Sequence, residues 1–293
     1  MKPNWKTLIG MGAALGLTAL APAAKAQWSI GPVAGRVAPA GQNAYVFLVF
    51  ANPLAGREAS FNEMYQNTHM GDLVQLQGFV GAQRFRLYPD VQPRSKPQAY
   101  KHGYVILWDE AGATTPARNV VSGAIAGGKS RKIDGFDYTT PGANRSMTYK
   151  VAGPRVTRPD GRKAFMPAAD DNKTPRPNRY IMLDLASPAP GVTEADYRAA
   201  LDKEIHQVLT LPGWMAAQPL VLEPTLGPDL KPATGPKFMV LWEVEGSAQA
   251  AAAALDQAVK AGQVQMAKGD PAIEEHTFWE PITPHITRED FAR

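Results

Sequence analysis

Three side chains suited to acid–base chemistry recur at helical spacing in the first part of the chain. Tyr65, His69 and Asp72 are separated by four and three residues, so on a helix they share one face. Histidine has a proton equilibrium near neutrality and can both accept and donate a proton. These residues are the first candidates for a site. A core position for Tyr65 and a helix-anchoring role for His69 would fit the same spacing.

An arginine follows on the next predicted strand. Arg84 comes directly after the segment 78–83, and a guanidinium at that point can bind a carboxylate or an enolate through paired hydrogen bonds. An ion pair with Glu58 or Asp72 is the structural alternative. We include Arg84 in the candidate site as an anion-binding group.

The sequence gives little support for a bound metal or cofactor. It contains no H-x-x-x-H or H-E-x-x-H pair, no P-loop, no G-x-G-x-x-G and no G-x-S-x-G. Covalent haem is excluded because C-x-x-C-H is absent, whereas a haem held by a single histidine stays open. We expect no metal and no cofactor.

The elements that must position these residues occur twice. Residues 43–87 match residues 178–222 at an offset of 135 without a gap, and residues 104–109 match residues 238–243 at an offset of 134. Ordered matches across turns and helices indicate two copies of one structural unit. The two matched tryptophans are expected in the core. The matched pairs are Tyr45 and Tyr180, Pro53 and Pro188, Gly56 and Gly191, Gly78 and Gly213, Gln83 and Gln218, and Trp108 and Trp242.

Each copy has the same predicted order of elements, β-α-β-β-α-β, which is the ferredoxin-like arrangement. Short apolar runs predict the strands, and apolar residues at helical spacing predict the helices. The first copy has strands at 45–50, 79–87, 104–108 and 133–138 and helices at 58–76 and 113–127. The second copy has strands at 180–185, 215–222, 238–244 and 275–280 and helices at 194–209 and 247–266.

Packing of these elements predicts the fold. Helices cover one face of each four-stranded sheet, and the other apolar face also needs a cover. The simplest cover is the sheet of the other copy. We therefore predict an α+β fold in which two tandem ferredoxin-like repeats pack their antiparallel sheets as an intramolecular dimeric α/β barrel, with the helices outside.

The residues around the candidate site resemble a known family. The pattern Asn52-Pro, Gly56-Arg-Glu, Phe61-Asn-Glu-Met-Tyr65, His69, Asp72 and Gly78-Phe-Val-Gly-Ala-Gln-Arg84 is similar to the EthD-like branch of the dimeric α/β-barrel superfamily. The specific likeness lies within residues 43–87, whereas the second copy shares the element order and only Gly213-Trp214 in motif.

This resemblance implies a fold and a type of chemistry. In relatives that act as cyclases or isomerases, a histidine with a tyrosine moves a proton without a cofactor. The resemblance therefore assigns His69 as the general acid/base and Tyr65 as a proton donor or orienting group. The superfamily also contains decarboxylases, monooxygenases and haem enzymes, so the fold alone does not fix the reaction.

The second copy departs from the family pattern at the candidate site, and the first copy departs from it at one position. We therefore expect one site, in the first copy, and a second copy that serves as scaffold. Met64 stands where the family often has Trp, Ala200 and Glu204 stand at the positions of Tyr65 and His69, and Pro219 or Leu220 stands at that of Arg84.

The N-terminus has the features of an export signal. Lys2 and Lys6 precede the apolar stretch 8–20, and Ala24-Lys25-Ala26 precedes Gln27. A charged start, a short apolar segment and an A-x-A-like site are the parts of a secretory signal peptide. The apolar stretch holds 13 residues (8 to 20), fewer than the roughly 20 that span a bilayer. We expect removal of residues 1–26, a periplasmic or secreted protein, and no membrane attachment after cleavage.

Charge and composition define the remaining expectations. Loss of residues 1–26 removes three lysines and no acidic residue, which lowers the net charge from +4 to +1, so nothing favours nucleic acid as a partner. Residues 129–179 carry twelve Lys/Arg and five Asp/Glu. We assign 143–177 to a basic, proline-rich linker between a first repeat at 27–142 and a second at 178–293. A lid over an anionic ligand is the alternative for this linker.

These observations lead to a ranked set of functions. The first is an exported, cofactor-independent lyase, isomerase or cyclase that acts on a small, partly apolar carbonyl compound. The alternatives are a non-catalytic small-molecule-binding protein and a haem-binding oxidoreductase of the same superfamily. A duplicated chain can close its barrel within itself, so the chain is expected to be a monomer or a homodimer.

Overall fold

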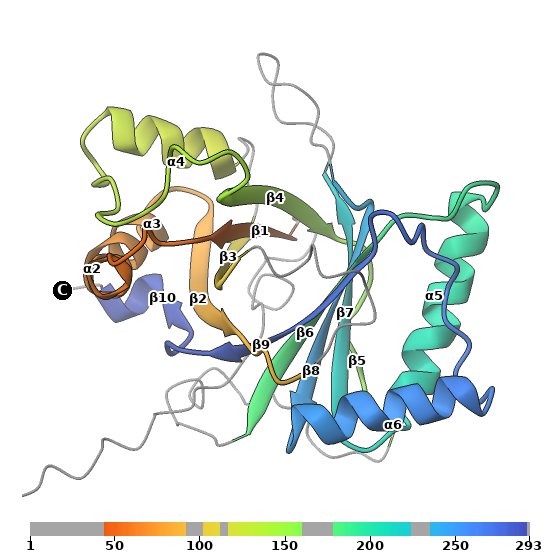
Figure 1. Cartoon of the computed structure of the whole chain (residues 1–293). Coiled ribbons are helices and arrows are strands. Elements are labelled where there is room, and N and C mark those ends of the chain that lie inside the picture. Colours follow the sequence, from red (N-terminus) through yellow and green to blue (C-terminus); the bar gives the residue numbers. More distant parts are fainter. Residues whose placement is uncertain (1–43, 92–101, 112–116, 160–177, 224–234, 292–293) are drawn as a thin grey trace, which may run out of the picture.

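The strands form a closed barrel in the computed structural model, which describes residues 44–91, 102–111, 117–159, 178–223 and 235–291 (Figure 1). Eight antiparallel strands follow one another in the order β2-β3-β1-β4-β7-β8-β6-β9, and β9 pairs with β2 to close the ring. The predicted α+β class and the closed barrel are confirmed. Residues 1–26, assigned to the export signal, lie outside the described residues. We call residues 44–159 the first half and residues 178–291 the second half.

The first half supplies four barrel strands, a short fifth strand and the helices that cover them. Its elements are β1 (Ala44–Ala51), α2 (Glu58–Met64), the π-helical turn η1 (Tyr65–His69), α3 (Met70–Val74), β2 (Phe79–Leu87), β3 (Tyr104–Ala111), α4 (Ala117–Ala126), β4 (Asn144–Val151) and β5 (Val156–Thr157).

The second half supplies the other four barrel strands in the same order. Within the described residues, no helix has the length and apolarity to cross a bilayer. The elements are β6 (Arg179–Ala186), α5 (Glu194–Val208), β7 (Trp214–Leu222), β8 (Phe238–Glu245), α6 (Ala248–Lys260), β9 (Glu275–Pro281), β10 (Ile286–Thr287) and the 3₁₀ turn η4 (Arg288–Phe291).

The two faces of a barrel strand pack into different hydrophobic cores, one inside the barrel and one under the helices. Successive side chains of a strand point to opposite faces, and in β1 Val46 and Leu48 belong to the barrel interior with Leu183 and Leu241 of the second half. Phe47 instead packs under the helices of its own half. In Figure 1, α2, α3 and α4 cover the barrel on one side, and α5 and α6 cover it on the other. The outer face under α2–α4 is where the candidate residues meet.

The prediction of a strand at 133–138 is wrong, because this segment forms a turn. Gly135 has φ +76° and lies so close to Arg57 that a Cβ would come within 2.8 Å of the Arg57 carbonyl oxygen. The Asp137 carboxylate accepts hydrogen bonds from the two amides at 139 and 140, at 3.0 and 2.9 Å. Such local bonds compete with the ladder of a sheet. The turn instead lies over the outer face of the first half.

The fourth strand of the first half is β4, inside the segment 143–177 that we assigned to the linker. β4 pairs with β7 across the two halves, and β5 also pairs with β7. Arg145 and Arg155, two of the basic residues of this segment, bind Glu275 and Glu243 of the second half at 2.5 and 2.6 Å. The described part of this segment therefore joins the halves, and residues 160–177 lie outside the described residues.

Candidate functional site

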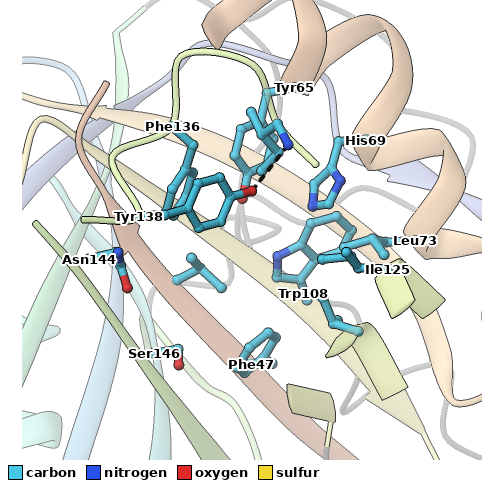
Figure 2. Close-up of a pocket in the computed structure, with 13 residues that line it drawn as sticks. Phe47, Tyr65, His69, Leu73, Trp108, Ile125, Phe136, Tyr138, Asn144 and Ser146 are labelled. Atoms are coloured by element: carbon cyan, nitrogen blue, oxygen red, sulfur yellow. Dashed lines mark hydrogen bonds between the residues drawn. The ribbon is translucent and has the colours of Figure 1, made fainter. Parts of the chain in front are cut away.

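A cavity of about 140 Å³ lies between the outer face of the first-half sheet and the helices that cover it (Figure 2). Its walls are mainly aromatic and aliphatic, with a few polar groups, which is the usual composition of a small-molecule pocket. Tyr138, half exposed, is among its walls. The lining residues are Phe47, Val49, Tyr65, His69, Leu73, Trp108, Val121, Ile125, Ile133, Phe136, Tyr138, Asn144 and Ser146.

A π turn brings two of the predicted residues to this cavity. The predicted helix 58–76 is interrupted at Tyr65–His69, where the amide of Met70 bonds the carbonyl of Tyr65. Single π turns inside helices are rare and occur frequently at functional sites. The Tyr65 and His69 rings meet edge to face with centroids 5.1 Å apart, and both line the cavity.

His69 is buried and electrically neutral at physiological pH. Its side chain is only 3% exposed, and burial lowers its pKa to about 4, with the positive charge of Arg84 acting in the same direction and a backbone hydrogen bond with Arg131 acting against it. The Nδ1 atom lies 3.2 Å from the Ser130 hydroxyl. A partner on one ring nitrogen fixes the tautomer and ring orientation, so Ser130 is a positioning residue for the imidazole.

Tyr65 has an enclosed ring and a hydroxyl without a hydrogen bond to any residue that the structure describes. Burial raises the pKa of this phenol well above its usual value, and the nearby Arg84 only partly offsets that effect. The phenol therefore keeps its proton at neutral pH. It is a hydrogen-bond donor available to a ligand in the cavity.

Arg84 lies behind the Tyr65 ring and does not line the cavity. Its guanidinium stacks 4.6 Å from the centroid of that ring and donates to the side-chain carbonyl of Asn62 at 2.7 Å. Asn62 in turn donates to the Tyr104 hydroxyl, which bonds Glu58. Hydrogen bonds through Asn62 and Tyr104 therefore connect the buried Arg84 guanidinium to the Glu58 carboxylate. Arg84 packs against the Tyr65 ring, and its charge adds to the effect of burial, which keeps His69 neutral.

Trp108 has an indole N–H with no partner among the described residues. Its side chain is 1% exposed and its Nε1 atom is fully buried without a hydrogen bond. Figure 2 shows this nitrogen on the side of the ring that faces Tyr138 and Ser146. Leaving a buried donor unpaired costs roughly 1–3 kcal/mol, so an acceptor atom bound in the cavity would be stabilised here. The expected core position is confirmed, and the residue also lines the cavity.

Asp72 is the fourth predicted residue, and the structure does not bring it to the cavity. It is half-buried on α3, one turn beyond His69, and is not among the lining residues. Prediction from spacing therefore found Tyr65 and His69 and missed the loop residues Ser130 and Tyr138, which carry no motif.

The cavity beside His69 is small, and the described residues around it hold no cluster of metal ligands. Among the described residues, no group of three or more His, Cys, Asp or Glu side chains is placed to hold a metal ion. Pockets for drug-sized ligands measure about 300–1,000 Å³, and a haem is at least that large. A cavity of about 140 Å³ is close to the size that holds one benzene ring.

Comparison with known proteins identifies the fold. No family model and no curated protein matches the chain. An anthrone oxidase-like protein matches with 15% identity and a TM-score of 0.50 over 85% of this chain and 94% of its own. A putative monooxygenase from Fusobacterium nucleatum subsp. nucleatum has 7% identity and a TM-score of 0.45 over 84% and 94%. The R173K mutant of chlorite dismutase from Candidatus Nitrospira defluvii has 11% sequence identity and a TM-score of 0.43. The match covers 83% of this chain and 93% of that protein.

These structures are members of the dimeric α/β-barrel superfamily, and identities this low carry the fold alone. The match to the anthrone oxidase-like protein is consistent with the mixed α+β fold and the closed eight-stranded antiparallel barrel described above.

Proposed function

We propose that the chain is a cofactor-independent enzyme that moves a proton on a small, single-ring carbonyl compound bound beside His69. The observation that carries the proposal is that a neutral imidazole, the Tyr65 hydroxyl and the unpaired indole N–H of Trp108 line one apolar cavity. The reaction classes that need only this equipment are those of a lyase, an isomerase or a cyclase.

The chemistry follows from the positions of these groups. The substrate oxygen accepts hydrogen bonds from Tyr65 and from the Trp108 indole, which stabilise negative charge as it develops on that oxygen. The neutral imidazole of His69 takes a proton from the adjacent carbon, and an enolate and an imidazolium result. The same proton then returns to another atom of the substrate, which completes an isomerisation without a net change in oxidation state.

The low pKa of His69, about 4, is compatible with this step when substrate is bound. A general base works best with a pKa near the working pH. The value of about 4 is the pKa of His69 when no ligand is in the cavity. An enolate beside the ring is a full negative charge in a site of low dielectric, and such a neighbour raises the pKa of an imidazole. The bound intermediate therefore supplies the charge that stabilises the imidazolium.

The size of the cavity restricts the substrate class. The name of the anthrone oxidase-like relative is in keeping with a ring that bears a carbonyl, but an anthrone has three fused rings. A cavity of about 140 Å³ accommodates one ring. The substrate of this chain is therefore a monocyclic ketone, enone or phenol tautomer.

The proposal includes an origin for the chain as a duplicated ferredoxin-like unit of the EthD-like branch. Both halves have the order β-α-β-β-α-β, and each carries an irregularity at the same point of its second strand, at Phe79/Gly81 and at Trp214/Ala216. After its fourth strand each half adds a short strap, Val156-Thr-Arg158 or Ile286-Thr-Arg288, that pairs with the second strand of the other half.

The straps end in the same contact. Arg158 donates to the carbonyl of Leu211, and Arg288 donates to the carbonyl of Leu76, and both carbonyls lie just beyond the helix that precedes the second strand. Because the barrel closes within one chain, we also propose a monomer. Export to the periplasm or beyond, with loss of residues 1–26, remains part of the proposal.

An exchange assay tests the proposed reaction. Cyclohexanone, 2-cyclohexenone and acetophenone are incubated with the protein in D₂O, and loss of the proton next to the carbonyl is followed by NMR. We expect exchange above the buffer rate for at least one probe, reduced about 10²–10⁴-fold by His69→Gln with an unchanged thermal midpoint. His206→Gln, on the exposed face of α5, is the matched control. Equal exchange in both variants would overturn the proposal.

A non-catalytic binding protein is the second candidate. The pKa of His69, lowered to about 4, favours it, because an imidazole with such a pKa is a weak base unless the ligand itself raises it. Native mass spectrometry of protein incubated with the three probes separates the candidates. A binding protein retains an unaltered probe and produces no exchange.

A further inference from the structure

The second half replaces the cavity with a buried cluster of ionisable groups. Asp184 stands 135 residues after Val49, and Glu204 stands 135 residues after His69. In β6 Asp184 pairs with His276 just as Val49 pairs with Ser146 in β1. Three lining positions of the cavity therefore correspond to an aspartate, a glutamate and a histidine in the other half.

His276 lies in direct contact with two carboxylates, and Glu204 interacts with the same groups electrostatically. Nε2 of His276 is 3.1 Å from Oδ1 of Asp184 and 3.4 Å from Oε1 of Glu274. The Glu204 carboxyl accepts a hydrogen bond from the amide of Ala267 at 2.7 Å. Glu204, His276 and Asp184 are 2%, 6% and 6% exposed, so water does not screen their charges.

The cluster is built from three segments of the second half. α5 contributes Glu204 and the phenol of Tyr197, β6 contributes Asp184, and β9 contributes His276, with Glu274 directly before it. The buried side chains that α6 and β8 add to this core are apolar, and they include Ala251, Leu255, Ala258, Val240 and Trp242.

Three carboxyl groups therefore surround one imidazole, and those of Asp184 and Glu204 are buried with it. If all were ionised, the net charge would be −2, and burying uncompensated charge costs several kcal/mol. Protons relieve this cost. Burial, followed by the charge of Asp184, raises the pKa of Glu204 to about 8. Asp184 and Glu274 overcome the effect of burial on His276 and raise its pKa to about 10.

We propose that Glu204, Asp184, Glu274 and His276 form a proton-dependent latch that holds α5 against β6 and β9, so that the second half tightens in mild acid and loosens as the pH rises. The latch is independent of the proposed enzymatic function. It lies under α5, which covers the side of the barrel opposite to α2–α4 (Figure 1), and the cavity lies under α2–α4.

The sign of the effect follows from proton linkage. Glu204 and His276 have raised pKa values in the folded state, so their contribution to stability is fully present below their unfolded values, 4.5 and 6.5. It is lost as the pH rises through about 8 for Glu204 and about 10 for His276. The stability that Glu204 contributes is thus lost between pH 4.5 and 8. The stability that His276 contributes is lost between pH 6.5 and 10.

Hydrogen exchange of the full-length protein at pH 5.5, 7 and 8.5, corrected for intrinsic rates, tests the latch. Peptides from α5 are expected to lose protection as the pH rises, by up to tenfold for each pH unit per proton released. Peptides from α2 and α3 serve as the internal reference and keep their protection. Glu204→Gln, which mimics the protonated carboxyl, is expected to remove most of the dependence between pH 5.5 and 8. Asp202→Asn, two residues earlier on the exposed face of α5, is expected to leave it unchanged.

Two results would overturn the latch. One is protection of α5 in the wild-type protein that does not vary from pH 5.5 to 8.5. The other is a Glu204→Gln variant with the same pH dependence as the wild type. If Glu204→Gln does not fold, ¹³C NMR titration of the glutamate carboxyls in the wild-type protein decides: a midpoint near 8 for one carboxyl supports the proposal, and only midpoints near 4.5 contradict it.

Discussion

The two halves of the barrel place a histidine under the covering helices and give it opposite environments. Burial lowers the pKa of His69 to about 4, and the nearby cation Arg84 acts in the same direction. His276 has two carboxylates within 3.4 Å, so its pKa rises to about 10. The comparison teaches that this architecture leaves the chemistry under the helices free to vary, because the sheet is held together by backbone bonds and by the barrel interior.

The difference in packing has identifiable causes. In the second half α5 is an uninterrupted helix of 15 residues, and Trp214 fills the space beside Trp242 with ring centroids 5.2 Å apart. In the first half the smaller Phe79 faces Trp108 at 5.6 Å, and the helix contains the π turn that holds His69. A smaller ring and a distorted helix leave room for the cavity.

Removal of Asp184 is expected to have the largest effect on stability. Asp184→Ala leaves a buried imidazolium with one carboxylate fewer, and breaking a buried ion pair costs about 3 kcal/mol or more. Val49→Ala, at the matching position of the first half, removes two methyl groups beside an existing cavity and costs about 1 kcal/mol. Urea denaturation at pH 7 compares the two variants. Equal losses would show that the cluster contributes no ionic stabilisation.

Replacement of Trp108 is expected to affect ligand affinity more than folding. Trp108→Phe removes the unpaired indole donor, and we expect affinity for the monocyclic ketone that gives the highest exchange to fall about tenfold, equivalent to about 1.4 kcal/mol. Trp242→Phe removes the matching indole from the second half and leaves affinity unchanged. Calorimetric titration of both variants checks this, and an equal affinity loss in both would contradict a role for the first indole.

Replacement of Ser130 is expected to have the smallest effect. Ser130→Ala removes one hydrogen bond from His69, which is worth about 1 kcal/mol of stability, and frees the ring to change tautomer. ¹⁵N shifts of the imidazole report the tautomer directly. Identical shifts in the variant and the wild type would mean that the hydroxyl does not orient the ring.

Much of the fold could be predicted from the sequence, because the spacing of apolar residues and the positions of glycines indicate the helices, strands and turns. The positions of β1, β2, β3 and the second-half elements agree with the structure to within a few residues, apart from the end of α6. The strand β4 was missed because Asn144, Arg145 and Lys150 break its apolar pattern, although Arg145 is paired inside the barrel. A cross-half ion pair has no local signal in a sequence.

The candidate site was accessible only in part. Tyr65 and His69 share a helical face and were found, whereas Arg84 was expected to contact a ligand and instead supports Tyr65. Tyr138 lines the cavity and Ser130 contacts the His69 ring, both from loops whose course depends on the positive φ values of Gly128 and Gly135. The cluster around His276 was also missed, since its four members come from segments almost a hundred residues apart.

The central claim is that the barrel keeps His69 neutral and His276 charged, although both are buried. Titration of the five histidines of the wild-type protein by ¹H–¹⁵N NMR from pH 4 to 10, assigned with His69→Gln and His276→Gln, tests it most directly. The account predicts an imidazole that stays neutral down to about pH 4 at His69 and one that stays protonated up to about pH 10 at His276. Titration of both histidines near 6.5, the value of a solvent-exposed ring, would contradict it.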